Sequence, residues 1–171
     1  RPDIIYIFSK DILRHRRAQK EDAVWLKKGE EYKDETLSVR AFGSTDVGVS
    51  FLLQAGGKKI FHAGDLNNWH WMDESTEAEW KGAEKNFLHE LDDLYAYTPE
   101  VDVAMFPVDP RLGKEYMRGA GQFVTKIKTH IFVPMHFTPE YAKANAFRDF
   151  AEAHGVRFVS LTHRGQKIEI E

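Results

Sequence analysis

The chain has no cysteine among its 171 residues. This absence excludes disulfides, thiolate zinc sites and cysteine nucleophiles, so any bound metal must be held by His, Asp or Glu. The sequence also lacks an apolar run long enough to span a membrane, and no basic segment followed by an apolar one marks a secretory signal. We therefore expect a cytoplasmic protein with no membrane partner.

A strong excess of charge of one sign is missing as well. The chain has 24 Lys and Arg residues against 27 Asp and Glu residues, a net charge of -3, which gives no overall attraction to nucleic acid. One local basic run, Arg14-His15-Arg16-Arg17, fits either the solvated side of a short helix or a phosphate-binding patch. With 42% hydrophobic and 13% aromatic residues the chain can bury one core, and we predict a single domain over residues 1–171.

The first part of the chain is typical of β-structure. Ile4 to Phe8 is a continuous apolar run, which predicts a strand buried on both faces. Three further segments either alternate apolar and polar residues or directly follow a Gly-Gly turn. This pattern predicts an antiparallel meander. These segments are residues 36–42, 49–53 and 58–61.

Helical periodicity begins in the second part. Apolar residues recur at three- and four-residue steps from Glu77 to a stop before Pro99, which predicts a long amphipathic helix. Thr138-Pro139-Glu140 has the cap, proline and acid of a helix start. Strands are predicted at residues 101–107, 131–134, 156–161 and 166–171, and further helices around Phe123 and over 138–155. This alternation predicts an α/β fold in which a sheet is layered against helices.

The stretch from Phe61 to Trp71 carries the clearest chemical signal. Asp65 follows a predicted strand and comes directly after Gly64, where the backbone can turn sharply and an ion can approach. Asp65 offers oxygen, and His62 and His70 offer imidazole nitrogen, so a divalent metal with mixed ligands fits this stretch. The alternative is that Asp65 caps a turn and the two histidines are packing or surface groups.

A second strand, residues 131–134, also ends at a potential ligand, His136. The pairing of Ile60-Phe61-His62-Ala63-Gly64-Asp65 with Val133-Pro134-Met135-His136, with the lead-in at 26–31, resembles the metallo-β-lactamase superfamily. In particular it is similar to bacterial hydrolases related to ascorbate-phosphate lactonases. The resemblance implies an αββα sandwich in which Asp65 and His136 bind a divalent metal and act in catalysis. The metal expected is zinc, with manganese and iron as alternatives, and His62 supports the site.

The sequence departs from the family pattern in two places. The His-x-His-x-Asp-His cluster that precedes this region in the family is absent, so we interpret the chain as the C-terminal portion of a longer protein, with an incomplete metal site. Many relatives also have a histidine ligand in the segment Gly43 to Gly48, where this chain offers Asp46. Asp46 either ligates the metal through oxygen or hydrogen-bonds its own backbone in an Asx turn.

The resemblance implies a metal-dependent hydrolase of a small ester, lactone or phosphorylated metabolite, acting through a metal-bound hydroxide. Trp69, His70 and Trp71 either wall the substrate pocket or anchor the core. Arg111, with Asp109 beside it, lies on a loop that can reach the same mouth, where Arg111 suits a phosphate or carboxylate or is simply solvated. The alternatives are a nucleic-acid-processing nuclease, which the charge argues against, and a metal-free binding domain. A homo-oligomer is compatible with the sequence.

Two geometric expectations follow. If Asp65 and His136 share one ion, their ligating atoms should lie within about 5 Å of each other, because each ligand sits about 2.0 to 2.2 Å from zinc. The other histidines have no comparable context and are predicted to lie at the surface or at caps. They are His15, His89, His130, His154 and His163.

Overall fold

The computed structural model describes residues 4–15 and 23–170. Within them, seven strands form one sheet in the order β3-β4-β5-β6-β7-β8-β9, and β1 and β2 form a separate two-stranded sheet. The strands are β1 Ile7–Ser9, β2 Val24–Leu26, β3 Glu31–Lys33, β4 Leu37–Phe42, β5 Ser50–Ala55, β6 Lys58–His62, β7 Glu100–Pro107, β8 Lys128–Met135 and β9 Arg157–Phe158. The helices are α1 Glu77–Tyr97, α2 Arg118–Lys126, α3 Tyr141–Asn145 and α4 Arg148–Ala153, with 3-10 helices η1 Lys10–His15 and η2 Pro110–Glu115.

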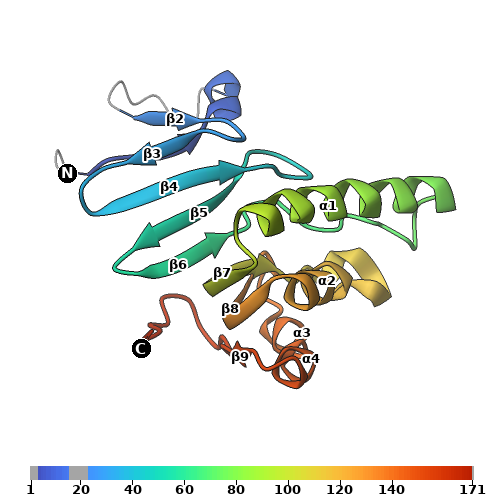
Figure 1. The fold of residues 1–171 in the computed structure, drawn as a ribbon. Helices are drawn as coiled ribbons and strands as arrows, with labels where there is room; N and C mark the ends of the chain where they lie inside the picture. Colours follow the sequence, from blue (N-terminus) through green and yellow to red (C-terminus); the bar gives the residue numbers. More distant parts are fainter. Residues whose placement is uncertain (1–3, 16–22, 171) are drawn as a thin grey trace.

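The sheet changes from antiparallel to parallel at β6. The pairs from β3 to β6 are antiparallel, which confirms the predicted meander, and the pairs from β6 to β9 are parallel. Parallel neighbours need crossover connections, and α1 and α2 supply them between β6, β7 and β8. The predicted α/β arrangement is confirmed, with α1 to α4 gathered on one side of the strands (Figure 1).

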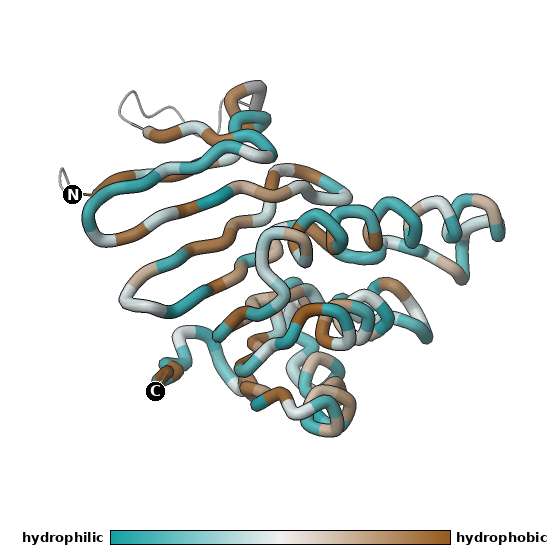
Figure 2. Tube along the Cα trace, in the orientation of Figure 1, coloured by the Kyte–Doolittle hydropathy of each residue, from teal (hydrophilic) through white to brown (hydrophobic). Residues whose placement is uncertain are grey.

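The two faces of the sheet bury different rows of side chains. Phe61, Ala104 and Phe132 are neighbours in register and belong to the main core, which also contains Phe87 of α1 and Phe123 of α2. Successive residues of a strand point to opposite faces, so the adjacent row packs on the face away from the helices. That row is Ile60, Val103 and Ile131. Hydrophobic segments accordingly follow the strands, whereas much of α1 is hydrophilic (Figure 2).

Helix α1 agrees with the sequence prediction at both ends. Thr76 accepts a hydrogen bond from the backbone of Glu79, and the Glu79 side chain accepts from the backbone of Thr76, which forms a capping box. Phe87 and two leucines of α1 are fully buried, and the helix stops before Pro99. None of the helices in the described part of the chain is long and apolar enough to cross a membrane.

The prediction of a doubly buried strand from Ile4 to Phe8 is wrong. Strand β1 begins at Ile7, and Ile4 and Ile5 are 44% and 55% exposed. Within the described residues β1 pairs with β2 alone, and Ile7 packs against the cluster of Leu26, Val39 and Ala41 but is only partly buried. The basic run predicted to lie on a short helix falls at the end of η1, and its last two residues, 16 and 17, lie outside the described residues.

The single helix predicted over residues 138–155 is divided into α3 and α4. Thr138 has a positive φ of 49°, so it does not adopt the extended conformation of an N-cap, and α3 begins only at Tyr141. Between α3 and α4 the Asn145 side chain donates to the carbonyl of Leu161 at 2.9 Å and accepts from its N–H at 3.1 Å. This long-range contact coincides with the end of α3.

The predicted closing strands are shorter than expected. Only Arg157–Phe158 of the segment 156–161 is a strand, and residues 166–170, the described part of the last predicted strand, form none. The Gln166 side chain instead accepts from Thr162 N–H and donates to the Ser160 carbonyl, which folds this segment back on itself.

Candidate metal site

Three neighbouring parallel strands end at the same edge of the sheet. His62 of β6 is in register with Met105 of β7, and Pro107 of β7 is in register with Met135 of β8. The pairing continues for one residue beyond β6 and β7, because Ala63 N–H donates to Met105 O at 2.9 Å and Val108 N–H to Met135 O at 3.0 Å. The carboxyl ends of parallel strands are the usual place for ligands in such sheets. Asp65, Asp109 and His136 each lie within three residues of one of these strand ends.

Asp65 and His136 face each other across this edge. The Asp65 Oδ1 atom is 3.3 Å from His136 Nε2, and both side chains are about one-third exposed, at 36% and 32%. The predicted proximity of the two residues is confirmed. Two ligands about 2.1 Å from one tetrahedral ion lie about 3.4 Å apart, so this separation suits two ligands of a single zinc ion.

The turn that places Asp65 depends on Gly64. Gly64 has a φ of 57°, and a Cβ atom on it would lie 2.9 Å from the Val49 carbonyl oxygen, so the position favours glycine. The N–H of Gly64 donates to His62 Nδ1 at 3.1 Å. Desolvation lowers the pKa of His62, the direction that favours the neutral imidazole, whose Nδ1 can accept this bond. His62 therefore stabilises the turn through its own ring.

The other nitrogen of His136 contacts a buried carboxylate. His136 Nδ1 lies 2.9 Å from Asp109 Oδ2, and the Asp109 side chain has no exposed surface. Arg111 donates to Asp109 from its backbone N–H at 3.0 Å and from Nε at 2.9 Å, and its Nη2 also donates. Burial by itself would raise the pKa of Asp109, but the hydrogen bonds from Arg111 and His136 outweigh it and hold the pKa below its ordinary value. Asp109 is thus an ionised acceptor.

His136 also has an unusual backbone. Its φ is 64°, in the left-handed region that residues with a side chain rarely adopt. Such strain persists only where the surrounding structure determines it, and it is concentrated at functional sites. The preceding residue, Met135, is the last of β8, so the strain begins where the ladder stops.

Trp69 and Arg111 both contact the pair. The Trp69 ring lies edge-on to the His136 ring at 5.3 Å, and its Nε1–H donates to the Asp65 carbonyl at 2.8 Å. Arg111 Nη2 is 3.4 Å from His136 Nδ1, although the carboxylate that Arg111 binds is Asp109 of the chain itself. The structure brings these two predicted residues to the strand ends. Their contact with a substrate stays a prediction.

The sequence left two roles open for His70, lining the substrate pocket or packing in the core, and the structure favours packing in the core. It is 1% exposed, its Nδ1 accepts from Met72 N–H at 3.1 Å, and its Nε2 lies 3.2 Å from the Glu115 carbonyl. With both ring nitrogens used inside the protein, His70 offers no free atom to a substrate. The prediction that it binds substrate is therefore corrected.

Asp46 lines a pocket together with Trp69, but it does not complete a group of three metal-competent side chains in the described part of the chain. Asp46 is exposed, and its backbone N–H donates to the Ser44 hydroxyl at 3.3 Å, so the side chain that bonds the backbone of this turn is that of Ser44. Among residues 4–15 and 23–170, no three His, Asp or Glu side chains are grouped so as to hold a metal ion. The predicted metal-ligating role of Asp46 is not supported.

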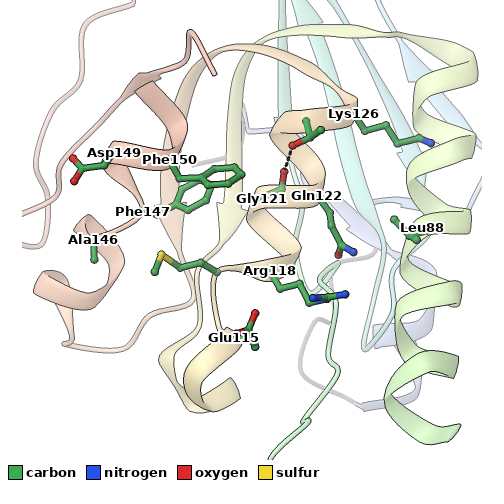
Figure 3. A pocket seen from close by; sticks show the side chains of 12 residues that line it. Leu88, Glu115, Arg118, Gly121, Gln122, Lys126, Ala146, Phe147, Asp149 and Phe150 are labelled. Atoms are coloured by element: carbon green, nitrogen blue, oxygen red, sulfur yellow. Dashed lines mark hydrogen bonds between the residues drawn. The ribbon is translucent and has the colours of Figure 1, made fainter. Parts of the chain in front are cut away.

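A separate pocket of about 790 Å³ lies between α1, α2 and α4 (Figure 3). Its apolar lining includes Leu88, Met117, Phe147 and Phe150, and Arg118 and Gln122 stand on the side toward α1. Neither Asp65 nor His136 lines it. The polar groups at the strand ends and the apolar pocket are thus different places on the molecule.

Asp109 lies on the loop that the sequence predicts for it, but its contact with His136 was not predicted. The signal was available, because Asp109 follows its strand as Asp65 and His136 follow theirs. Had β6, β7 and β8 been recognised as consecutive parallel strands, all three residues would have been expected at one edge.

No protein-family model matches the sequence, and no curated protein matches it. Several solved structures are similar in fold. A protein of Parabacteroides distasonis named as a metal-dependent hydrolase has a TM-score of 0.63 and 15% identity, over 93% of this chain and 64% of that one. The metallo hydrolase Igni18 of the hyperthermophilic archaeon Ignicoccus hospitalis has a TM-score of 0.59 and 15% identity, over 91% and 65% of the two chains. The metallo-β-lactamase fold protein YhfI of Bacillus subtilis has a TM-score of 0.54 and 6% identity, over 92% and 63%. The chain spans less than two thirds of the length of each of these proteins.

Proposed function

Because the chain has the metallo-β-lactamase fold, we propose that it is part of a metal-dependent hydrolase that acts on a small ester, lactone or phosphorylated metabolite. The observation that carries the proposal is the separation of 3.3 Å between Asp65 Oδ1 and His136 Nε2 at the ends of β6 and β8. The substrate class follows from the resemblance of the sequence to lactonase-related hydrolases.

The donor set fits a divalent ion of borderline hardness. One carboxylate oxygen and one imidazole nitrogen are ligands that zinc, manganese and iron all accept. A catalytic zinc site has three protein ligands and one open position, and the described residues supply two. We propose that the remaining ligands lie outside these residues, in a longer form of the protein.

Each residue of the chain has a distinct role in this proposal. A bound divalent ion would lower the pKa of water to about 7 and polarise a carbonyl or phosphoryl oxygen. Asp65 contributes negative charge and one ligand atom, and Gly64 gives the backbone turn that presents it. His136 contributes a neutral nitrogen. Trp69 borders the pair with an aromatic face, which would keep one side of a substrate out of water.

The test is a comparison of three variants of the full-length protein. Asp65→Asn keeps the shape of the side chain and loses its charge, and His136→Ala loses the imidazole. We expect both to lower zinc affinity at least ~100-fold, because loss of a direct ligand should exceed the 10- to 100-fold effect of its supporting partners. Asp46→Asn is the matched control, an exposed carboxylate that lines a pocket with Trp69 and makes no ion pair with His136 in the described part of the chain.

Zinc and manganese binding would be measured by calorimetry, beside turnover of a phosphodiester, a lactone and a phosphorylated sugar acid and thermal unfolding of each variant. Normal metal content and turnover in Asp65→Asn would rule out the proposal. A loss in Asp46→Asn equal to that in Asp65→Asn would overturn the ligand assignment.

A further inference from the structure

Asp109 is an ionised carboxylate in a fully buried position, where a charge is unfavourable. Its side chain has no exposed surface, whereas its neighbour His136 is one-third exposed. Burying an unpaired carboxylate costs several kcal/mol or more, so the surrounding donors must compensate it. The two Asp109 oxygens accept from the Arg111 backbone and from Arg111 Nε and Nη2, and Oδ2 also lies 2.9 Å from His136 Nδ1. Arg111 contacts both oxygens of the carboxylate, and His136 shares Oδ2 with Arg111.

The direction of the hydrogen bond to His136 follows from this arrangement. An ionised carboxylate only accepts hydrogen bonds, so at 2.9 Å the proton must lie on His136 Nδ1. A neutral imidazole with its proton on Nδ1 has its lone pair on Nε2. Nε2 is the atom that faces Asp65 at 3.3 Å. The opposite tautomer would place the Nδ1 lone pair against the lone pairs of Asp109 at 2.9 Å. The proposed tautomer places the Nε2 lone pair toward Asp65 at 3.3 Å, and that carboxylate is 36% exposed, so water can solvate it, whereas Asp109 is fully buried and depends on protein donors.

One competing donor is close. Arg111 Nη2 lies 3.4 Å from His136 Nδ1 and would favour a lone pair on that atom. The Asp109 contact is 0.5 Å shorter, and Nη2 is already donating to Asp109. The shorter, charge-assisted hydrogen bond dominates.

We propose that Asp109 is a positioning residue that fixes His136 in the tautomer protonated at Nδ1 and so presents an unprotonated Nε2 beside Asp65. Arg111 acts through Asp109 by keeping it ionised and oriented inside the protein. Only one part of this inference rests on the proposed function, namely that Nε2 of His136 binds a metal. The tautomer itself needs no metal.

The first measurement is long-range proton–nitrogen NMR of the metal-free protein labelled at histidine nitrogen, at a pH where the imidazole is neutral. Wild-type His136 should show a protonated Nδ1 and an unprotonated Nε2. In Asp109→Asn the amide can donate to Nδ1, so the proton should move to Nε2 in a substantial fraction of molecules. Exchange of Asp for Asn beside a catalytic histidine has this effect in serine proteases. Asp149→Asn, a change of an exposed carboxylate on α4, should leave the His136 signals unchanged.

The second measurement is zinc affinity by competition with a chelating dye. Asp109→Asn should bind zinc 10- to 100-fold more weakly than wild type, and Arg111→Lys should have a smaller effect of the same sign, because lysine keeps the charge and loses the two-pronged geometry. Backbone amide spectra would verify that each variant is folded.

The outcomes separate this inference from the proposed function. A wild-type His136 protonated at Nε2 overturns the inference, whatever the protein binds. A tautomer that moves in Asp109→Asn without any change in zinc affinity overturns the positioning role. If the tautomer moves as expected and wild type binds no zinc or manganese, the tautomer assignment stands and the proposed metal site fails.

Discussion

At the scale of one residue, His136 has an unfavourable backbone conformation directly after strand β8. The left-handed conformation costs a residue with a Cβ atom about 1 to 2 kcal/mol, and glycine escapes most of that cost. Comparing His136→Gly with His136→Ala isolates this cost, because both variants lack the imidazole. We expect His136→Gly to be the more stable of the two by about 1 kcal/mol, measured by urea unfolding.

At a position with a negative φ the alanine variant would be the more stable of the two, because glycine loses more conformational freedom on folding than alanine does. Equal stability, or a more stable alanine variant, would mean that the positive φ of His136 is not a property of the protein in solution. Met135→Gly against Met135→Ala, one residue earlier in the regular strand, gives that ordinary order as a control.

Some residue roles were predictable from the sequence and others were not. The proximity of Asp65 and His136 was predicted from the resemblance to the metallo-β-lactamase superfamily, because that resemblance implies that both residues bind the metal. The burial of His70 did not follow, because its partner is the carbonyl of Glu115, on a helix far along the chain. A histidine pattern does not reveal which ring nitrogens the fold will use.

At the scale of elements, two glycines in helices have opposite roles. Gly119 in α2 is buried, and a Cβ atom there would lie 2.0 Å from the Asn67 side-chain oxygen and 3.0 Å from Asn68 N. Asn67 and Asn68 belong to the loop that follows Asp65, so Gly119 lets α2 approach this loop closely. Gly119→Ala should destabilise the protein by about 1 to 3 kcal/mol through overpacking.

Gly82 provides the matched substitution. It lies within α1, and a Cβ atom there would meet nothing within 4 Å. Gly82→Ala should therefore stabilise the protein by about 0.5 to 1 kcal/mol. Both changes would be measured by chemical denaturation, and effects of the same sign in the two variants would contradict this account of α2 packing.

Local signals decided which elements were predicted well. Helix α1 has its cap, its apolar stripe and its stop within one segment, so its bounds could be predicted. The division between α3 and α4 coincides with the hydrogen bonds of Asn145 to the backbone of Leu161, a contact that no local pattern contains. The Thr138-Pro139-Glu140 signal likewise failed because Thr138 adopts a positive φ.

At the scale of the whole molecule, the two sheets should differ in stability. Strands β1 and β2 have three residues each and pair with each other, whereas β7 and β8 have eight residues each and lie inside the large sheet. Two-stranded units are marginal on their own. Backbone amides of β1 and β2 should therefore exchange with solvent about two orders of magnitude faster than those of β7 and β8.

Hydrogen exchange followed by NMR would measure this difference. Equal protection in the two sheets would indicate that they unfold together.

The sequence led to a wrong prediction for the start of the chain, because an apolar run such as Ile4 to Phe8 predicts burial but does not show whether other elements pack on both of its faces. The meander was predictable from its tight turns, whereas the parallel order of β6, β7 and β8 depends on crossovers that join distant segments.

The parallel order also has a consequence for the time course of folding. Asp65 and His136 meet only after the chain through α1, β7 and α2 has closed, and pairing of such distant strands is slow. The pair is then absent from the unfolded chain and from any intermediate in which β8 is unpaired. If the contacts to the metal form only after the transition state, an ion bound by these two residues would slow unfolding and leave the folding rate unchanged. The lifetime of the folded protein, rather than the speed at which it folds, would then depend on the supply of metal.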